Sequence, residues 1–177
     1  VNYEVSKVVE EERNQLIQAG HSNVRYYDNK QTSITLTGGQ TSEDTNRINI
    51  NADSGEQSYQ LSINANEGNN YSKNIISGSM TGEKYTNFNL NSRSTGNPSF
   101  DVDIDIESTS NQDGYDHAQS NIYNRYDSND SSFTVDVKSE SGYARNYFDG
   151  QYTSGDITPN LTASTEGSAS NDYAYVY

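Results

Sequence analysis

A strict alternation of apolar and acidic residues between positions 100 and 106 constrains the fold of this chain more than any other feature. The apolar residues are Phe100, Val102, Ile104 and Ile106, and the acidic residues are Asp101, Asp103 and Asp105. Successive side chains of a β-strand point to opposite faces of its sheet, so a strand here buries one set and exposes the other. We therefore predict that the four apolar side chains face a core and that the three carboxylates face solvent.

The same two-residue period recurs along the chain from about residue 32 onward. Apolar residues alternate with polar ones at 34–36, 48–50, 59–63 and 133–137. Glycine-containing turn signals separate these stretches, at 38–39, 67–69, 113–114, 141–142 and 166–167. Alternation bounded by such turns is typical of half-buried strands joined by short connections. The pattern predicts a β domain over residues 32–177.

The connections between these strands favour antiparallel pairing. No helix long enough for a parallel crossover is predicted between them, and parallel neighbours usually need one. A loose repeat relates residues 59–80 to residues 133–152, but its irregular length favours a meander over a solenoid with fixed rungs. We therefore expect an all-β, antiparallel meander of about ten or eleven short strands, packed as a sandwich or a barrel.

The first thirty residues follow a different period. Val5, Val8, Val9, Leu16 and Ile17 recur at helical spacing. A glycine at position 20 then stands where a helix often ends. We predict that residues 1–31 form a short helix or arm before the β domain. Such an element either packs on its own sheet or docks on a neighbouring subunit, and the sequence leaves both open.

Charge and hydropathy exclude two classes of partner. The formal net charge is −14, and the 11 basic residues are scattered along the chain. Phosphate binding needs clustered basic residues, so we expect no nucleic acid partner. No stretch approaches the roughly 18 consecutive apolar residues of a spanning helix, so we expect no membrane insertion.

The cysteine count and the first residue bear on location. The chain has no cysteine, which excludes disulfides, thiol catalysis and zinc ribbons. It begins with Val1, without a charged and then apolar leader, as expected of a mature chain whose signal peptide has been removed. We predict a secreted, extracellular or cell-surface protein.

Residues typical of catalysis are scarce. The two histidines, His21 and His117, have no partner residues at a recognisable spacing. The segment Gly78–Gly82 contains two glycines, but its serine does not match a nucleophile elbow. We therefore predict that the protein is not an enzyme and holds no cofactor.

One segment partly resembles a calcium-binding loop. Asn111, Asp113, Gly114 and Asp116 resemble part of such a loop, but the first and twelfth positions are Thr109 and Ser120 instead of acidic residues. An ordinary Asp-Gly turn explains this segment without a metal. We predict no metal site.

The 15 tyrosines are the most unusual part of the composition. Nine of them lie after residue 114, at positions 115, 123, 126, 143, 147, 152, 173, 175 and 177. Tyrosine combines a large contact area with a polar tip, so it serves shallow cores, subunit interfaces and sugar stacking alike. The sequence does not choose among these three roles.

These features together favour an extracellular structural subunit. We expect copies of the chain to associate by β-strand addition into a surface fibre, a pilus-like filament or an adhesive matrix. The expected interface residues are Val5, Val9, Leu16, Tyr173, Tyr175 and Tyr177. One alternative is a carbohydrate-binding module or lectin-like adhesin domain that binds surface glycans. Another is an all-β virion or tail structural protein.

Overall fold

A computed structural model describes residues 2–6, 24–25, 31–35, 45–55, 58–65, 73–93, 98–109, 117–125, 130–151, 155–166 and 173–176. All regular secondary structure in these ranges is β-strand. The 13 strands are β1 (Asn2–Ser6), β2 (Val24–Arg25), β3 (Gln31–Thr35), β4 (Thr45–Asp53), β5 (Tyr59–Ala65), β6 (Lys73–Gly82), β7 (Thr86–Ser92), β8 (Ser99–Ser108), β9 (His117–Arg125), β10 (Ser131–Ser139), β11 (Tyr143–Gln151), β12 (Ile157–Thr165) and β13 (Tyr173–Val176).

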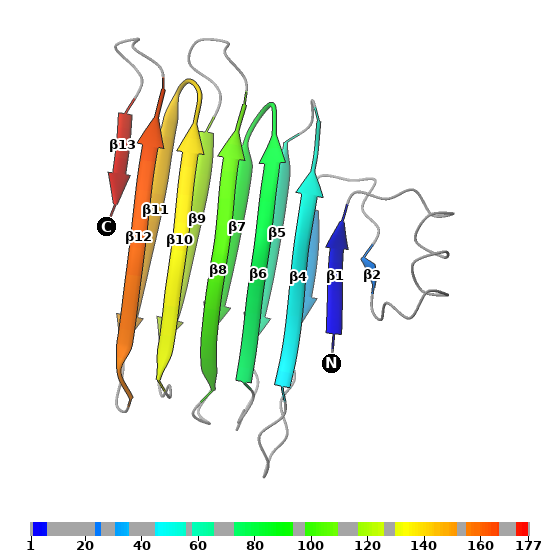
Figure 1. Cartoon of the computed structure of the whole chain (residues 1–177), viewed down its shortest axis with the longest axis vertical. Helices are drawn as coiled ribbons and strands as arrows, with labels where there is room; N and C mark the ends of the chain where they lie inside the picture. The colour runs from blue at the N-terminus through cyan, green and yellow to red at the C-terminus, as the bar shows by residue number, and fades with distance from the viewer. Residues whose placement is uncertain are drawn as a thin grey trace.

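The strands form two sheets in which every neighbouring pair is parallel. Sheet A has the order β12-β10-β8-β6-β4-β1-β2, and sheet B has the order β13-β11-β9-β7-β5-β3. Figure 1 shows sheet A in front of sheet B, with the strands of the two sheets running in opposite directions. From β3 onward, consecutive strands therefore alternate between the two sheets.

This arrangement is a β-solenoid, and the expected antiparallel sandwich or barrel is wrong. Each coil contributes one strand to each sheet, and four complete coils run from β5 to β12. A strand returns beside its predecessor after the chain has crossed the opposite sheet, for example from β6 through β7 to β8. That passage supplies the long connection that parallel neighbours require, so no helix is needed.

The irregular repeat also has a physical explanation. Register partners are Lys73 and Ser99 in one coil but Thr86 and Ala118 in another, which are separations of 26 and 32 residues. The strands stay in register because the extra residues lie in the connections. Variable coil length is therefore compatible with a solenoid, although it favoured a meander when only the sequence was considered.

The described part of the predicted N-terminal helix or arm is extended. Residues 2–6 form β1, which pairs with β4, and residues 24–25 form β2, which pairs with β1. Residues 7–23 and 26–30 lie outside the described ranges. The helical spacing of Val5 and Val8 therefore did not predict the strand at residues 2–6, which continues sheet A.

The core lies between the two sheets, where equivalent residues of successive coils stack in columns. One column of sheet A contains Ile48, Ile76, Val102 and Phe133, each at most 1% exposed. The prediction for β8 is confirmed. Its four apolar side chains are 1% exposed, and its three aspartates are exposed on the outer face. Stacked apolar columns give this thin core its continuity along the solenoid axis.

Hydrogen bonds between coils continue through the turns. The backbone N–H of Ser54 donates to the carbonyl of Thr81 at 2.9 Å, and that of Thr109 donates to the carbonyl of Gly82 at 2.8 Å. Gly55 has φ 58°, which glycine adopts without the strain of a side chain, and its N–H donates to the Asp53 carboxylate. The turns therefore stack on each other as the strands do.

One glycine in β6 lies unusually close to the neighbouring strand. Gly78 has φ +129°, and an ideal Cβ at this position would lie 1.9 Å from the carbonyl oxygen of Ile50 in β4. Its register partners on the two sides are Ile50 and Ile104. A side chain here would strain φ and overlap backbone atoms, so glycine is required for this close approach.

A buried asparagine links the two sheets near the C-terminal end of the solenoid. Asn146 in β11 is fully buried, and its Nδ2 donates to the carbonyl oxygens of Val135 in β10 at 2.9 Å and Thr162 in β12 at 3.0 Å. Buried N–H donors are normally hydrogen-bonded, and these two bonds satisfy both N–H groups of the Asn146 amide. Asn146 therefore fixes the last coil relative to the coil before it.

Candidate functional site

The end of the solenoid formed by β12 and β13 is the first candidate site, and we call it the C-terminal edge. In the described sheets, β12 pairs only with β10, and β13 pairs only with β11. Figure 1 places these two strands at the opposite end of the solenoid from β1 and β2. An edge strand presents unpaired backbone groups to which another strand can pair.

Burial falls sharply at this edge. Val135 and Val137 of β10 are at most 1% exposed, whereas their register partners Leu161 and Ala163 of β12 are only partly buried. Val176 of β13 is 47% exposed, the one large hydrophobic side chain exposed among the described residues. The apolar columns of the core are therefore open to solvent at the C-terminal edge.

The predicted interface residues are divided among several locations. Val5 lies in β1 at the register position of Ile50, and Tyr173 lies in β13 beside Tyr143. Tyr175 is half-buried, and its ring stacks on that of Tyr143 with centroids 6.2 Å apart. Val9, Leu16 and Tyr177 lie outside the described ranges. The backbones of Val5, Tyr173 and Tyr175 thus belong to strands at or near the two ends of the solenoid.

The outer face of sheet A is acidic. Asp103 and Asp105 of β8 lie beside Thr134 and Asp136 of β10. Burial is the main cause that raises the pKa of Asp105, and the neighbouring carboxylates of Asp136 and Asp103 raise it further. A basic residue reduces the repulsion at one end of this face. Lys138 Nζ lies 2.6 Å from a Glu166 carboxylate oxygen and 3.7 Å from one of Glu107.

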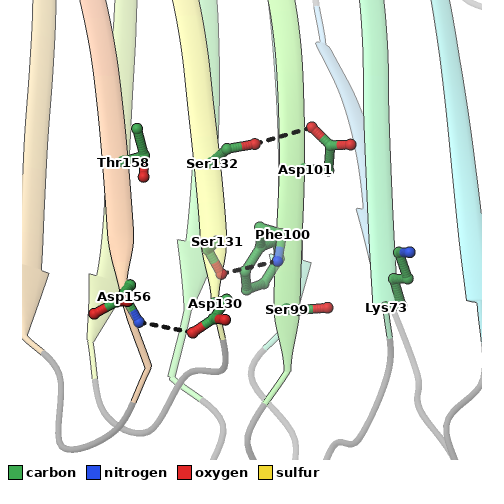
Figure 2. Close-up of a pocket in the computed structure, with 9 residues that line it drawn as sticks. All are labelled: Lys73, Ser99, Phe100, Asp101, Asp130, Ser131, Ser132, Asp156 and Thr158. Carbon is green, nitrogen blue, oxygen red and sulfur yellow. Dashed lines mark hydrogen bonds between the residues drawn. The ribbon is translucent and has the colours of Figure 1, made fainter.

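A shallow pocket of about 380 Å³ lies where strands β6, β8, β10 and β12 begin. Figure 2 shows hydrogen bonds between several of its lining residues. Ser131 Oγ accepts from the Phe100 N–H at 3.0 Å, and Ser132 Oγ donates to Asp101 at 3.0 Å. Asp130 accepts from the N–H of Asp156 at 2.8 Å. These hydrogen bonds join adjacent coils, so the polar groups that make them have a structural role.

The outer face of sheet B has a different chemistry. It carries a chain of hydrogen-bonded amides that we call the amide ladder, which consists of Gln60, Asn87, Asn89 and Asn121. Asn87 donates to Gln60 at 3.4 Å, and Asn121 donates to both Asn87 and Asn89 at 3.1 Å. Each amide comes from a different coil than its partner, so the ladder runs along the solenoid axis.

Half-buried tyrosines continue this face toward the C-terminal edge. The tyrosine strip consists of Tyr85, Tyr123, Tyr143, Tyr147 and Tyr175. The rings of Tyr123 and Tyr147 lie 5.4 Å apart, and the guanidinium of Arg145 lies 5.1 Å above the ring of Tyr147. Tyr85 donates to Gln119 at 3.4 Å. Burial is the main cause that raises the pKa of Tyr85, and the neighbouring Tyr143 raises it further.

Sequence reasoning identified the tyrosines but missed the amides. Tyr123, Tyr143, Tyr147 and Tyr175 belong to the late cluster, and the structure places them on one outer face. The amides are spread over residues 60–121 and align only in the parallel register. The detectable signal was the alternation of Asn87, Asn89 and Asn91 with apolar residues in one strand.

The remaining residues that the sequence singled out lie either in regular strands or outside the described ranges. His117 begins β9, and Gly78–Gly82 forms the second half of the regular strand β6. His21 and the calcium-like residues Asn111, Asp113, Gly114 and Asp116 lie outside the described ranges. Within the described residues, no group of three or more histidine or carboxylate side chains is placed to hold a metal ion.

The described residues also include no helix that is long and apolar enough to cross a membrane. Comparison with family models, with curated proteins and with solved structures finds no match to this chain. The candidate sites therefore rest on geometry alone.

Proposed function

We propose that this protein is a structural subunit whose copies stack end to end into a fibre. The observation that supports this proposal is the C-terminal edge, where parallel strand pairing and the apolar columns are both open on one side. A solenoid is stable because each coil covers the next, and an uncovered coil is a site for association. Another copy can supply the next coil by β-strand addition.

The two ends of the solenoid have complementary shapes, because at each end one sheet extends further than the other. Among the described strands, sheet B ends with β13, with no later strand of sheet A opposite it, whereas sheet A begins with β1 and β2, which precede the first strand of sheet B. In a head-to-tail contact, β1 of the next copy fills the position beside β12, and β3 of that copy lies beside β13. The two-residue β2 pairs with β1 on the side where the other copy would bind. It must therefore be displaced when two copies join.

Head-to-tail contacts leave a new free end after each addition. Such a heterologous interface produces an open filament unless a rotation closes it into a ring. An isologous contact between two C-terminal edges would instead stop at a dimer. The proposal thus predicts growth with protein concentration. The acidic face of sheet A predicts that added salt promotes growth by screening repulsion between copies.

The test is to place a charge on the open core column at the C-terminal edge. Leu161→Lys puts an ammonium where the next copy would pack, while the lysine in the monomer reaches solvent past the half-buried position. We expect the wild-type chain to form filaments in negative-stain images and to sediment as a growing distribution. We expect Leu161→Lys to remain monomeric with an unchanged circular dichroism spectrum.

Ser164→Lys is the matched control, because it adds the same charge to the exposed outer face of the same strand. This variant should still form filaments. The proposal is wrong if the wild-type chain stays monomeric or stops at dimers at all concentrations tested. It is also wrong if Leu161→Lys polymerises as readily as Ser164→Lys. The extracellular location predicted from the sequence is a separate proposal, which fractionation of the producing cells would test.

A further inference from the structure

We propose that the outer face of sheet B binds an uncharged, linear, β-linked polysaccharide that lies along the solenoid axis. The binding surface is formed by the amide ladder and the tyrosine strip. This inference does not depend on filament formation, because the surface is complete within one chain and lies away from the C-terminal edge for most of its length.

The charge distribution favours an uncharged ligand. Among the outward-facing side chains described on the strands of sheet B, only Arg145 and Asp149 are charged, and their charges are opposite. Sheet A instead presents Asp101, Asp103 and Asp105 on its outer face. The formal net charge of −14 disfavours an anionic polymer, while a cationic partner would be drawn to sheet A. Sheet B is thus the face suited to a neutral polar polymer.

The side chains match the two chemistries of a sugar ring. The C–H face of a pyranose is apolar and packs on aromatic rings, for which Tyr123 and Tyr147 provide adjacent half-buried surfaces. Sugar hydroxyls both donate and accept, and the half-buried Asn89 amide can do either, since it donates one bond to Ser62 and accepts one from Asn121. Asn121 donates both of its N–H groups within the ladder, so its carbonyl oxygen is the group left to accept from a sugar hydroxyl.

The periodicity of the face favours a linear polymer. Equivalent positions repeat along the axis at the strand spacing of about 4.8 Å, which is close to the length of one sugar unit in an extended chain. Asn89 and Asn121 are register partners in successive coils, and Tyr147 continues the same row. Figure 1 shows the strands side by side with little twist, so an extended polymer could follow the row from the amides to the tyrosines.

The side chains are held in place before a ligand arrives. Asn121 donates to both Asn87 and Asn89 at 3.1 Å, and Arg145 lies over the Tyr147 ring. Ordering these groups in advance reduces the entropy lost on binding. A surface of flexible lysines or glutamates would lose more side-chain entropy on binding.

The test measures retention of the protein on insoluble cellulose and chitin, with soluble alginate in affinity electrophoresis as the anionic comparison. The Leu161→Lys background prevents filaments from sedimenting with the polysaccharide. We expect binding to at least one of the two neutral polymers and none to alginate. Tyr147→Ala should weaken binding about tenfold, as expected for loss of one well-packed aromatic contact. Thr134→Ala, on the exposed outer face of sheet A, is the control and should bind normally.

Three results would overturn the inference. They are no retention on either neutral polymer, equal retention of Tyr147→Ala and the parent, or equal affinity for alginate. A fourth result would assign the face to a second copy of this chain instead. In that case neither polymer binds, and Tyr147→Ala, introduced into the wild-type chain, abolishes lateral bundling of filaments while leaving their length unchanged. Circular dichroism of each variant shows whether the fold is intact.

Discussion

Gly78→Ala tests the closest approach between two coils. The added Cβ would lie 1.9 Å from the Ile50 carbonyl oxygen, and uncrowded non-bonded atoms stand roughly 3.5 Å apart. Strands β4 and β6 must then separate locally by about 1.5 Å, which lengthens the flanking ladder bonds beyond about 3.5 Å. Two such bonds are worth about 1–3 kcal/mol together, and alanine at this φ adds about 1–3 kcal/mol of strain.

The expected loss in the free energy of unfolding is thus about 2–6 kcal/mol, which lowers Tm by roughly 4–24 °C for a chain of this size. Thermal melts followed by circular dichroism, together with urea titrations, measure both quantities. Ser77→Ala and Ser79→Ala, the neighbours of Gly78 in β6, should change Tm little. A Tm for Gly78→Ala within one or two degrees of wild type would refute the close approach of β4 and β6.

Three further predictions concern the core, the acidic face and the link between the sheets. Phe133→Ala removes a fully buried ring that packs at 4.9 Å on Phe148, so it should cost about 3–5 kcal/mol and lower Tm by roughly 6–20 °C. Phe133→Leu should cost much less. A raised folded-state pKa means that ionisation of Asp105 opposes folding as pH rises through that value, so Asp105→Asn should raise Tm at pH 7 and lose this gain near about pH 3. Asn146→Ala leaves the carbonyls of Val135 and Thr162 without this donor and should cost about 1–3 kcal/mol in urea unfolding; an unchanged midpoint would contradict the link.

Alternation along the chain predicted the direction of side chains well. Phe100 and Val102 are buried, while Asp101 is exposed, because the pleat of one strand determines its two faces regardless of its neighbours. Phe133 is likewise buried as predicted. These properties depend on local geometry, so they can be read from a single segment.

Strand pairing was not predictable from the same pattern. The alternation in β8 is equally compatible with antiparallel neighbours, and β6 and β10 pair with it in parallel only because β7 and β9 lie in the other sheet. The lack of helices argues against parallel strands only when a helix is the crossover, and here a strand of the opposite sheet performs the crossover instead. The surface on sheet B depends on this pairing, which explains why Asn87 and Asn121 were overlooked.

The direction of the hydrogen bonds has a mechanical consequence. Strands lie across the solenoid axis, so their ladder bonds point along it, and those between turns, such as Ser54 to Thr81, also join successive coils. Tension along the axis therefore loads the junctions between coils one after another, and the weakest junction opens first. Tension applied along a strand shears many bonds at once and meets greater resistance. A fibre built from this chain would resist shear along its strands but would yield to axial load by peeling, one coil at a time.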